Sequence, residues 1–388
     1  MCVAKVFNTQ ETFDAQRHVD TIPSMVEHDS VVHVNVAPQA YDIRIARGLI
    51  DAAGRIIEKI VPSRRLAIVC DAALVSTHAQ RLDESLRRYG FSTHVVPLVG
   101  GEENKSLEAL LPAFDSLLRW KVDRSTPLLA LGGGLIGDMT GFLAATILRG
   151  VPFIQMPTTL LAMVDASVGG KTGVNHAVGK NLIGAFHQPA AVLIDPDVLT
   201  TLPDRQLCSG LAECIKHACI RDADELGRLE ATLPVLLSRD MSLFARLIAH
   251  NVSIKARVVE ADPFERGERA HLNFGHTFGH AIENVSHYHY THGECVALGM
   301  CAAADLSVSV GLLSPSDRDR IVSVVRLAGL PVSGLRLPVA SVVDAMAYDK
   351  KASAGGLRFV LLDRIGHAVV RDQIPLALIE RAVEFVRG

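Results

Sequence analysis

The chain has 388 residues, which is long enough for two or three domains with large cores. Its 49% apolar and 21% charged residues are the composition of an ordinary soluble globular protein. The 39 Lys and Arg against 42 Asp and Glu give a formal charge of -3, which excludes a general nucleic-acid binder because such a protein needs a net basic face. Any anionic ligand must therefore be held by a local cluster of cations.

The cysteines and the first 30 residues indicate a cytoplasmic protein. Seven cysteines, an odd number without a C-x-x-C pair, fit buried thiols in a reducing compartment better than a disulfide framework. Residues 1–30 carry several acidic side chains and no apolar run, so we expect a loosely ordered extension and no secretory signal. No stretch approaches the ~20 apolar residues of a membrane span, and no membrane partner is expected.

Short apolar runs that alternate with helical patterns fill the next part of the chain. Two alternating runs, residues 32–36 and 41–45, predict paired strands. Residues 66–70, 94–99, 127–131 and 153–156 then predict strands. Helices are predicted at residues 75–89 and 106–119 and from the glycines at 132 to about residue 148. Such alternation predicts a buried parallel sheet covered on both faces.

The character of the chain changes after residue 188. Pro189, Pro196 and Pro203 indicate a connecting stretch, and beyond residue 205 the apolar pattern is mainly helical. We therefore expect an extension (residues 1–30), a nucleotide-type, Rossmann-like α/β domain (31–206) and a mainly helical domain (207–388). A late strand pair is predicted at residues 357–362 and 368–371. Helices are predicted at residues 205–220, 243–261, 272–286, 293–311, 315–328 and 375–387.

A glycine-rich turn predicts a dinucleotide site. Residues 132–137 read Gly-Gly-Gly-Leu-Ile-Gly, which satisfies G-x-G-x-x-G between a strand and a helix. Glycines there let the backbone approach a pyrophosphate at the helix N-terminus. The usual ribose-binding acid some 20 residues later is missing, because Pro-Thr-Thr ends the next strand. Asp71, which ends an earlier strand, could hold the ribose, so we expect a dinucleotide bound unlike the common Rossmann arrangement.

The segment from Asp165 to Asn181 is rich in Gly, Asn and Lys. Lys171 and Lys180 suit a phosphate or a carboxylate, and the small residues permit close approach. ATP binding is disfavoured, because a P-loop with this Gly-Lys-Thr would need glycine where Asp165 stands. The alternative is a flexible surface loop with incidental lysines.

The histidines of the second half predict a metal site. His276 and His280 are four residues apart and would share a helix face, His292 follows, and Glu213 lies three residues before Lys216. Imidazoles with a carboxylate are the ligands that a catalytic zinc prefers. The spacing by itself favours both His276 and His280 as ligands. The chain holds 16 histidines, and any one alone would more often be an ordinary surface or core residue.

With these residues in view, the chain from about residue 31 to 388 resembles the 3-dehydroquinate synthase family of sugar-phosphate cyclases. A dense set of short motifs carries the resemblance, and it is more specific than any one of them. The motifs lie at residues 101–105, 132–138, 157–161, 170–175, 180–181, 212–213, 273–280, 292–294 and 349–351.

The resemblance implies a carbon–oxygen lyase of the shikimate pathway, which leads to aromatic amino acids. Such an enzyme converts 3-deoxy-D-arabino-heptulosonate 7-phosphate, a sugar acid phosphate, to 3-dehydroquinate and phosphate. The reaction passes through transient oxidation by NAD, phosphate elimination, re-reduction and an intramolecular aldol closure. The resemblance also implies a divalent metal, zinc or alternatively cobalt, and a homodimer.

The resemblance assigns roles to single residues. Glu213, His276 and His292 match the metal ligands, which replaces the pairing of His276 with His280 and makes His280 a substrate contact. The catalytic positions are Asp165, Lys171, Asn181, Lys216 and His280. The substrate positions are Arg149 (from the neighbouring subunit, at the phosphate), Lys171, Asn181, Lys216, Lys255, Arg269, Asn273, His280 and Lys350 or Lys351. The NAD positions are Asp71, Gly101, Glu102, Lys105, Gly133, Gly134, Gly137, Asp138, Thr158, Thr159, Lys171, Lys180, Leu199, Thr200 and Thr201.

Three other functions compete with this one. Another cyclase, making a secondary-metabolite precursor from a different sugar phosphate, would typically alter Arg269, Asn273 and His280, all of which are present. A metal-dependent alcohol or glycerol dehydrogenase would lack the cations at residues 171–181 and 269 and would turn over free NADH. A non-catalytic module would have lost a ligand or a lysine, and none is lost here.

Overall fold

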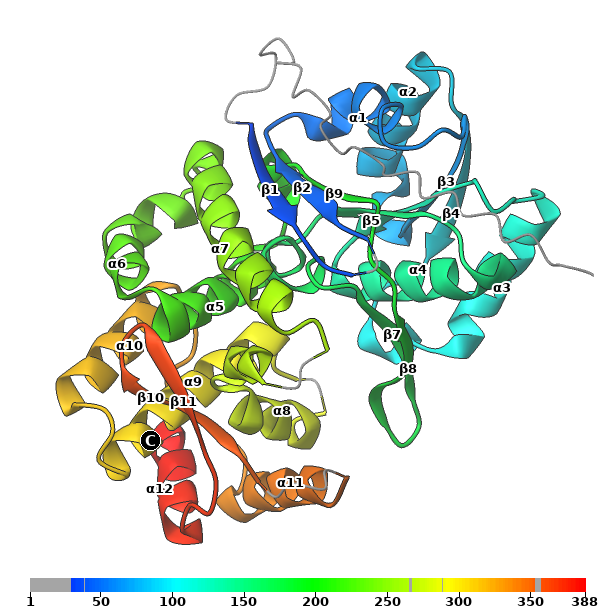
Figure 1. Cartoon of the computed structure of the whole chain (residues 1–388). Coiled ribbons are helices and arrows are strands. Elements are labelled where there is room, and N and C mark those ends of the chain that lie inside the picture. The colour runs from blue at the N-terminus through cyan, green and yellow to red at the C-terminus, as the bar shows by residue number, and fades with distance from the viewer. Residues whose placement is uncertain (1–28, 38, 265–266, 288, 353–356) are drawn as a thin grey trace, which may run out of the picture.

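The computed structural model describes residues 29–388 except 38, 265–266, 288 and 353–356, and for residues 347–352 it describes only the backbone. The predicted extension of residues 1–30 therefore lies almost entirely outside the described residues. A sheet flanked by helices forms the first half of the chain, and helices form most of the second half (Figure 1). The predicted fold class, a Rossmann-like parallel-sheet part followed by a mainly helical part, is confirmed.

A seven-stranded sheet organises the first half of the described chain. Its neighbouring strands are parallel except the first two, which pair antiparallel at one edge. The strands, in spatial order, are β1 (Ser30–Val34), β2 (Tyr41–Ile45), β9 (Ala191–Ile194), β6 (Phe153–Pro157), β5 (Leu128–Gly132), β3 (Arg65–Asp71) and β4 (Ser92–Leu98).

Helices cover both faces of this sheet, which is why its central strands are unbroken apolar runs. In β3, Ile68 and Cys70 join one core, and Ala67 and Val69 join the other. The first core includes apolar residues of α1 (Leu49–Ile57) and α2 (Gln80–Arg88), and the second those of α3 (Leu107–Arg119) and α4 (Gly134–Thr146). Short helical turns complete this half: η1 (Ala72–Leu74), η2 (Val75–Ala79), η3 (Glu102–Asn104), η4 (Ile147–Arg149), η5 (Ala162–Ala166) and η6 (Pro196–Thr201).

The strand order places a binding crevice at a defined point. From β4 through β3, β5, β6 and β9, the parallel strands follow the doubly wound order 2-1-3-4-5. The chain leaves β3 toward one edge and returns on its other side with β5, so the loops after these two strands diverge. Ligands of such sheets bind at this switch point, beyond the carboxyl ends of the strands. The loops concerned begin at Asp71 and at Gly132.

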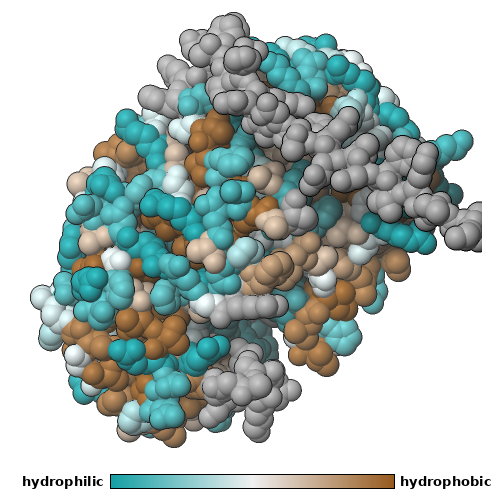
Figure 2. Space-filling model, in the orientation of Figure 1, coloured by the Kyte–Doolittle hydropathy of each residue, from teal (hydrophilic) through white to brown (hydrophobic). Residues whose placement is uncertain are grey.

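A hairpin of β7 (Lys171–His176) and β8 (Gly179–Phe186) leaves the sheet and projects beside the helical half (Figure 1). It contains the glycine- and lysine-rich segment of the sequence. Close pairing of its strands requires small residues, since a Cβ at Gly173 would lie 2.6 Å from the carbonyl oxygen of Ile183. Hydrophobic side chains gather over this hairpin (Figure 2), where Val178, Leu182 and Phe186 are exposed.

The second half packs around two buried helices, α5 (Asp204–Arg221) and α9 (His292–Ser309). Both are buried along most of their length, because other elements surround them. No helix in the described part of the chain has the length and apolar character of a membrane span. The other elements are α6 (Ala223–Leu237), α7 (Met241–Ala261), η7 (Glu268–Asn273), α8 (His276–Val285), α10 (Pro315–Leu327), α11 (Val339–Ala352), β10 (Phe359–Arg364), β11 (His367–Arg371) and α12 (Leu376–Arg387).

Some details of the predicted elements are wrong. The stretch after residue 188, taken as connecting chain, contains β9 in the middle of the sheet, and the segment of residues 171–186 is a hairpin rather than a loop. Helix α8 begins at His276, four residues later than predicted, because η7 precedes it. Helices α1, α6 and α11 were not predicted.

Candidate active site

Three side chains from three helices converge between the sheet and the helical half. Glu213 of α5 is fully buried, and its Oε1 lies 3.7 Å from His276 Nε2 and 3.5 Å from His292 Nε2. These three residues each offer a ligand atom, and the atoms lie within 4.8 Å of one another. His276 begins α8 and His292 begins α9, so both imidazoles stand at helix N-termini beside the carboxylate.

Two glycines allow these helices to approach closely enough. A Cβ at Gly293 would overlap the carbonyl oxygen of Ser209, so glycine is needed where α9 meets α5. A Cβ at Gly299 would likewise overlap the carbonyl oxygen of Gly275, where α9 meets the start of α8. A capping box formed by Thr291 and Glu294 fixes the first turn of α9. The local sequence thus sets the position of both histidines.

The charge of Glu213 is only partly compensated. The Lys216 ammonium contacts Oε2, yet among the described residues neither carboxylate oxygen has a hydrogen-bond partner. Burial favours a raised pKa for Glu213, but the Lys216 charge and then His292 outweigh it and hold the pKa well below its usual value. A buried anionic oxygen that faces two imidazole nitrogens is a fitting place for a divalent cation.

His280 belongs to a second, overlapping group. Its ring centroid lies 5.2 Å from that of His276, and it is exposed. His280, Glu283 and His292 also have ligand atoms within 4.8 Å of one another. Glu283, however, already has Lys180 Nζ 3.2 Å from its Oε1, whereas within the described residues Glu213 Oε1 faces the imidazoles of His276 and His292. The first group is therefore the better cation site.

Asp165 lies between the two halves of the molecule and is held by Lys255 of α7. The Lys255 ammonium donates to Asp165 Oδ1 at 2.7 Å and to its carbonyl oxygen. Burial favours a raised pKa for Asp165, but Lys255 and Lys216 outweigh it and lower the pKa. Burial lowers the pKa of Lys255 to about 8, despite the opposing charge of Asp165.

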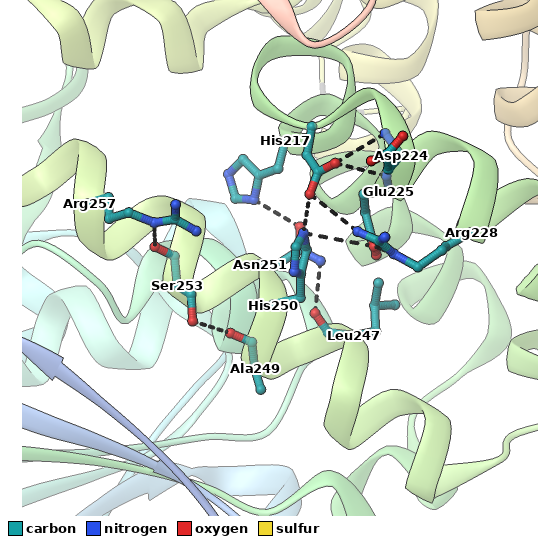
Figure 3. Close-up of polar contacts among 11 residues, drawn as sticks. His217, Asp224, Glu225, Arg228, Leu247, Ala249, His250, Asn251, Ser253 and Arg257 are labelled. Atoms are coloured by element: carbon teal, nitrogen blue, oxygen red, sulfur yellow. Dashed lines mark hydrogen bonds and ion pairs between the residues drawn. The ribbon is translucent and has the colours of Figure 1, made fainter.

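A buried histidine, His217, stands behind this ion pair. Its Nδ1 lies 3.0 Å from Asn251 Oδ1, and Asn251 Nδ2 donates to the carbonyl of Leu247, one turn earlier on α7 (Figure 3). Because the amide nitrogen is engaged with Leu247, its oxygen accepts the proton on Nδ1 and Nε2 keeps a lone pair. That Nε2 lies 4.0 Å from Asp165 Oδ1. Burial and then the Lys216 charge lower the pKa of His217 to about 4, so the ring is neutral.

A cavity of about 600 Å³ opens in front of these groups. It is lined from the sheet side by Asp138, Asp165 and the hairpin, and from the helical side by His276 and several cations. Arg269 is 3% exposed and donates to the carbonyl of Pro263 at 2.9 Å, which fixes its guanidinium. Of the residues predicted to hold substrate, the cavity is lined by Lys171, Asn181, Lys216, Lys255, Arg269 and Asn273.

The residues predicted to contact NAD lie around the carboxyl ends of the parallel strands. Asp71 ends β3, and η3 follows β4 after Gly101. Gly133 is the N-cap residue of α4 and offers no side-chain cap, so the N–H groups of the first turn of α4 lie at this edge. Thr158 and Thr159 follow β6, and Leu199, Thr200 and Thr201 lie in η6 after β9.

Lys105 connects this edge to the hairpin. Its ammonium is 5% exposed and donates to Asp138 Oδ2 at 2.7 Å and to Asn181 Oδ1 at 2.6 Å. Burial raises the pKa of Asp138 in spite of this lysine. Lys180, next on the hairpin, has Nζ 3.5 Å from Glu102 Oε1. These contacts join the hairpin to the carboxyl edge of the sheet.

Two predicted substrate positions in the described part of the chain, Arg149 and His280, do not line this cavity. Arg149 is exposed, lies outside the cavity lining, and follows Leu148 at positive φ (51°) with a positive φ of its own (66°). Such backbone is strained for residues other than glycine. Lys350 and Lys351 fall in α11, and their side chains lie outside the described residues.

Two polar residues of the site were not predicted. Glu283 follows His276 and His280 by seven and three residues, so the helical spacing that paired the histidines would also have found this carboxylate. His217 directly follows Lys216, but a histidine on an apolar helix carries no signal of its own. Its partner Asn251 is 34 residues away, and only the packing of α5 on α7 brings them together.

Comparison with known proteins agrees with this geometry. Residues 95–209 match the family described as 3-dehydroquinate synthase N-terminal, and residues 210–352 match 3-dehydroquinate synthase C-terminal. A 3-dehydroquinate synthase of Nitrosomonas europaea is 46% identical over 342 residues, which cover 88% of this chain and 92% of that protein.

Two solved cyclases share the fold. The 2-epi-5-epi-valiolone synthase of Streptomyces hygroscopicus subsp. jinggangensis 5008, with NAD+ and Zn2+ bound, is 29% identical with a TM-score of 0.84, covering 91% of this chain and 98% of that chain. A 2-deoxy-scyllo-inosose synthase complexed with carbaglucose-6-phosphate, NAD+ and Co2+ is 25% identical with a TM-score of 0.81, covering 91% and 99%. The matches span both halves of the molecule, and the chain belongs to the 3-dehydroquinate synthase family.

Proposed function

We propose that this chain is a 3-dehydroquinate synthase, a carbon–oxygen lyase that converts 3-deoxy-D-arabino-heptulosonate 7-phosphate to 3-dehydroquinate and phosphate in the shikimate pathway. One observation carries the proposal beyond family membership. A single cavity of about 600 Å³ is lined by four cationic side chains and lies against the cluster of Glu213, His276 and His292. A substrate with both a carboxylate and a phosphate needs such a set, because the chain as a whole has no basic excess.

The proposed metal ligands are Glu213, His276 and His292. The buried Oε1 of Glu213, which faces only imidazoles among the described groups, supports this assignment. The two similar cyclases hold NAD+ with Zn2+ or Co2+, and we propose NAD and zinc, or alternatively cobalt, for this chain. When bound, NAD supplies a hydride acceptor and donor, and the metal polarises the hydroxyl that is oxidised.

The side chains of the cavity orient the substrate. We assign the carboxylate to Arg269, whose fixed guanidinium offers a planar pair of donors. Lys216 stands against Glu213 and lines the cavity, so its charge stabilises an oxygen that loses a proton there. Asp165 accepts from substrate hydroxyls while Lys255 holds it in place. Lys171, Asn181, Asn273 and His280 complete the proposed contacts, with Lys350 or Lys351 from α11.

We propose that NAD binds across the switch point of the sheet. The uncapped start of α4 receives the pyrophosphate, and Asp71 at the end of β3 receives a ribose. A Cβ at Gly134 would lie 2.9 Å from the Cβ of Ala166, which supports a need for glycine in this turn. The other proposed contacts are Gly101, Glu102, Lys105, Gly133, Gly137, Asp138, Thr158, Thr159, Lys171, Lys180, Leu199, Thr200 and Thr201.

We propose a boundary near residue 206 between the NAD-binding and the metal- and substrate-binding parts, with residues 1–30 as a separate extension. The end of β9 at Ile194 and the start of α5 at Asp204 support this boundary. A cytoplasmic location is proposed from the cysteines, since those in the described part of the chain are free thiols and most are buried.

The proposed assembly is a homodimer whose active sites are shared. Arg149 is exposed and does not line the cavity of its own chain, which supports a role at the phosphate of a second chain. Exposed apolar side chains support association: Leu107, Leu111 and Leu118 lie along one face of α3, and Leu182 projects from the hairpin.

The test of this function compares two substrates. One is 3-deoxy-D-arabino-heptulosonate 7-phosphate, and the other is a seven-carbon ketose phosphate that lacks the carboxylate. With NAD and Zn2+ present, we expect phosphate release from the sugar acid to have a kcat/KM at least about a hundredfold higher than release from the ketose phosphate. The ketose phosphate has no carboxylate to pair with Arg269. A preference for the ketose phosphate without the carboxylate would instead assign the chain to another cyclase reaction.

A further inference from the structure

Glu283 is a polar residue that the proposed reaction does not use. It lies on α8, is 9% exposed and shares the helix face of His276 and His280. Its Oε1 lies 3.2 Å from Lys180 Nζ, and its Oε2 lies 3.9 Å from His292 Nδ1. Lys180 in turn has Nζ 3.5 Å from Glu102. The carboxylate therefore stands between the hairpin and the proposed metal ligands.

His292 lies between two carboxylates, one at each ring nitrogen. Its Nε2 faces Glu213 Oε1 at 3.5 Å, and its Nδ1 faces Glu283 Oε2. An imidazole that binds a metal through Nε2 must carry its proton on Nδ1, and that N–H needs an acceptor. Among the described residues, Glu283 has a carboxylate oxygen 3.9 Å from Nδ1, an ion-pair distance from which a small rotation of either side chain would form the hydrogen bond.

We propose that Glu283 is a positioning residue for the metal site. It accepts the Nδ1 proton of His292, which fixes the tautomer and ring orientation that leave Nε2 free for the metal, and Lys180 of the hairpin holds Glu283 through its other oxygen. The inference rests on the proposed ligands Glu213, His276 and His292. It extends them by linking a hairpin lysine at the nucleotide side to the metal through Glu283 and His292.

The nearby charge of Lys180 makes Glu283 a better hydrogen-bond acceptor for His292 than a metal ligand. Lys180 already compensates one of its oxygens, whereas Glu213 Oε1 faces only imidazoles within the described structure. If Glu283 were a ligand, the overlapping group of His280, Glu283 and His292 would be the metal site. The two arrangements differ in their use of His280, and this difference can be measured.

The experiment measures Zn2+ affinity of the metal-free full chain by competition with a chromophoric chelator. The variants are Glu283→Ala, Glu283→Gln, His276→Ala and His280→Ala. Glu230→Gln serves as a matched control, because Glu230 is an ion-paired helix carboxylate that faces Arg320 instead of a histidine. Circular dichroism verifies the fold of each variant, and alanine is itself a good helix former.

We expect the Zn2+ affinities of the variants to differ in a defined order. Glu283→Ala lowers Zn2+ affinity about 10- to 100-fold, and Glu283→Gln lowers it less, because an amide oxygen still accepts the Nδ1 proton. Glu230→Gln and His280→Ala keep an affinity near that of the unaltered chain. His276→Ala loses more affinity than any of these.

Each contrary result has a distinct meaning. Unaltered Zn2+ affinity in Glu283→Ala, with affinity lost in His276→Ala, overturns the positioning role and leaves the ligand set standing. Equal losses in the two Glu283 variants assign the effect to charge alone and overturn the hydrogen bond. A loss in His280→Ala as large as that in Glu283→Ala makes both residues ligands. Unaltered affinity in His276→Ala overturns the ligand set, and with it this inference.

Discussion

Glu213 shows how one buried residue can define a site. A carboxylate without exposure must be compensated, and Lys216 reaches only one of its oxygens. The other oxygen is left facing the Nε2 atoms of His276 and His292, neither of which needs a proton at neutral pH if a cation lies between them. A divalent metal ion between Glu213 Oε1 and the two imidazoles would compensate the remaining negative charge.

We predict that His276→Ala and His280→Ala differ in metal content. Loss of His276 removes one of three ligands, so metal binding and activity should both disappear while the fold remains. Loss of His280 should leave metal bound near stoichiometrically and lower turnover. Atomic absorption on both purified variants checks this. Equal metal loss in the two would restore the pairing of His276 and His280 that their spacing suggests.

From the lowered pKa of Lys255 we predict that raising the pH increases stability and decreases kcat/KM. Its pKa falls from 10.5 to about 8 in the folded chain, so between these values the unfolded chain keeps a proton that the folded chain has lost. Stability should therefore rise with pH across this window, by up to about 3 kcal/mol, because the unfolded state binds more protons. Anion binding needs the ammonium, so kcat/KM should fall about tenfold per pH unit above pH 8.

Denaturant unfolding and kinetics, each followed from pH 7 to 10.5, check this pair of trends. In Lys255→Arg the charge persists, so the alkaline fall in kcat/KM should move to higher pH. A kcat/KM that stays constant through pH 10 in the unaltered enzyme would exclude Lys255 as the titrating anion contact.

Among the elements, the start of α4 is the one to which we assign the pyrophosphate of NAD. We predict that Gly134→Ala weakens NAD binding on the order of tenfold, or about 1.4 kcal/mol. The new Cβ would lie 2.9 Å from the Cβ of Ala166, so the helix start must shift away from the turn. Isothermal titration with NAD measures the effect.

Gly227→Ala is the matched control for that change. Gly227 lies inside α6, and its added Cβ would meet only Arg320, at 3.5 Å. Alanine in a helix interior should stabilise the fold by about 0.5–1 kcal/mol and leave NAD affinity unchanged. Equal NAD affinity in both variants and in the unaltered chain would move the pyrophosphate away from α4.

The elements that the sequence predicts well are those with a strong repeating pattern. The apolar runs of β3, β5 and β6 and the helical periodicity of α5, α7 and α9 are found close to where they were expected. Strand β9 escaped detection because Pro189 and Pro196 flank a run of only four buried residues. The β7–β8 hairpin was missed because its glycine content resembles that of a loop. Gly173 and Gly184 are instead required where the two strands pair closely.

The same limit applies to the site. The motif histidines and Glu213 stand out by type and spacing, and the structure brings them together. Contacts that depend on the packing of distant helices leave no local trace. His217 with Asn251, and Lys180 with Glu283, are each joined only when separate elements meet.

At the scale of the whole molecule, Arg149 predicts that activity requires two chains. Mixing Arg149→Ala with Lys216→Ala under conditions that allow subunit exchange should restore activity. Each mixed dimer then has one site with both lesions and one intact site, so equal amounts should give about one quarter of full activity. Native mass spectrometry can demonstrate that the subunits have exchanged. If they have and no activity returns, Arg149 acts in the site of its own chain.

A cyclase of this family returns the hydride to its substrate and so recycles its NAD, whereas a dehydrogenase releases NADH. The most direct measurement supplies 3-deoxy-D-arabino-heptulosonate 7-phosphate with NAD at roughly one-tenth of its concentration and follows product, phosphate and NADH together. We predict complete conversion to 3-dehydroquinate, one phosphate per product molecule and no net NADH. Conversion that stops when the NAD is consumed, with NADH formed in equal amount, would contradict the account and indicate a dehydrogenase.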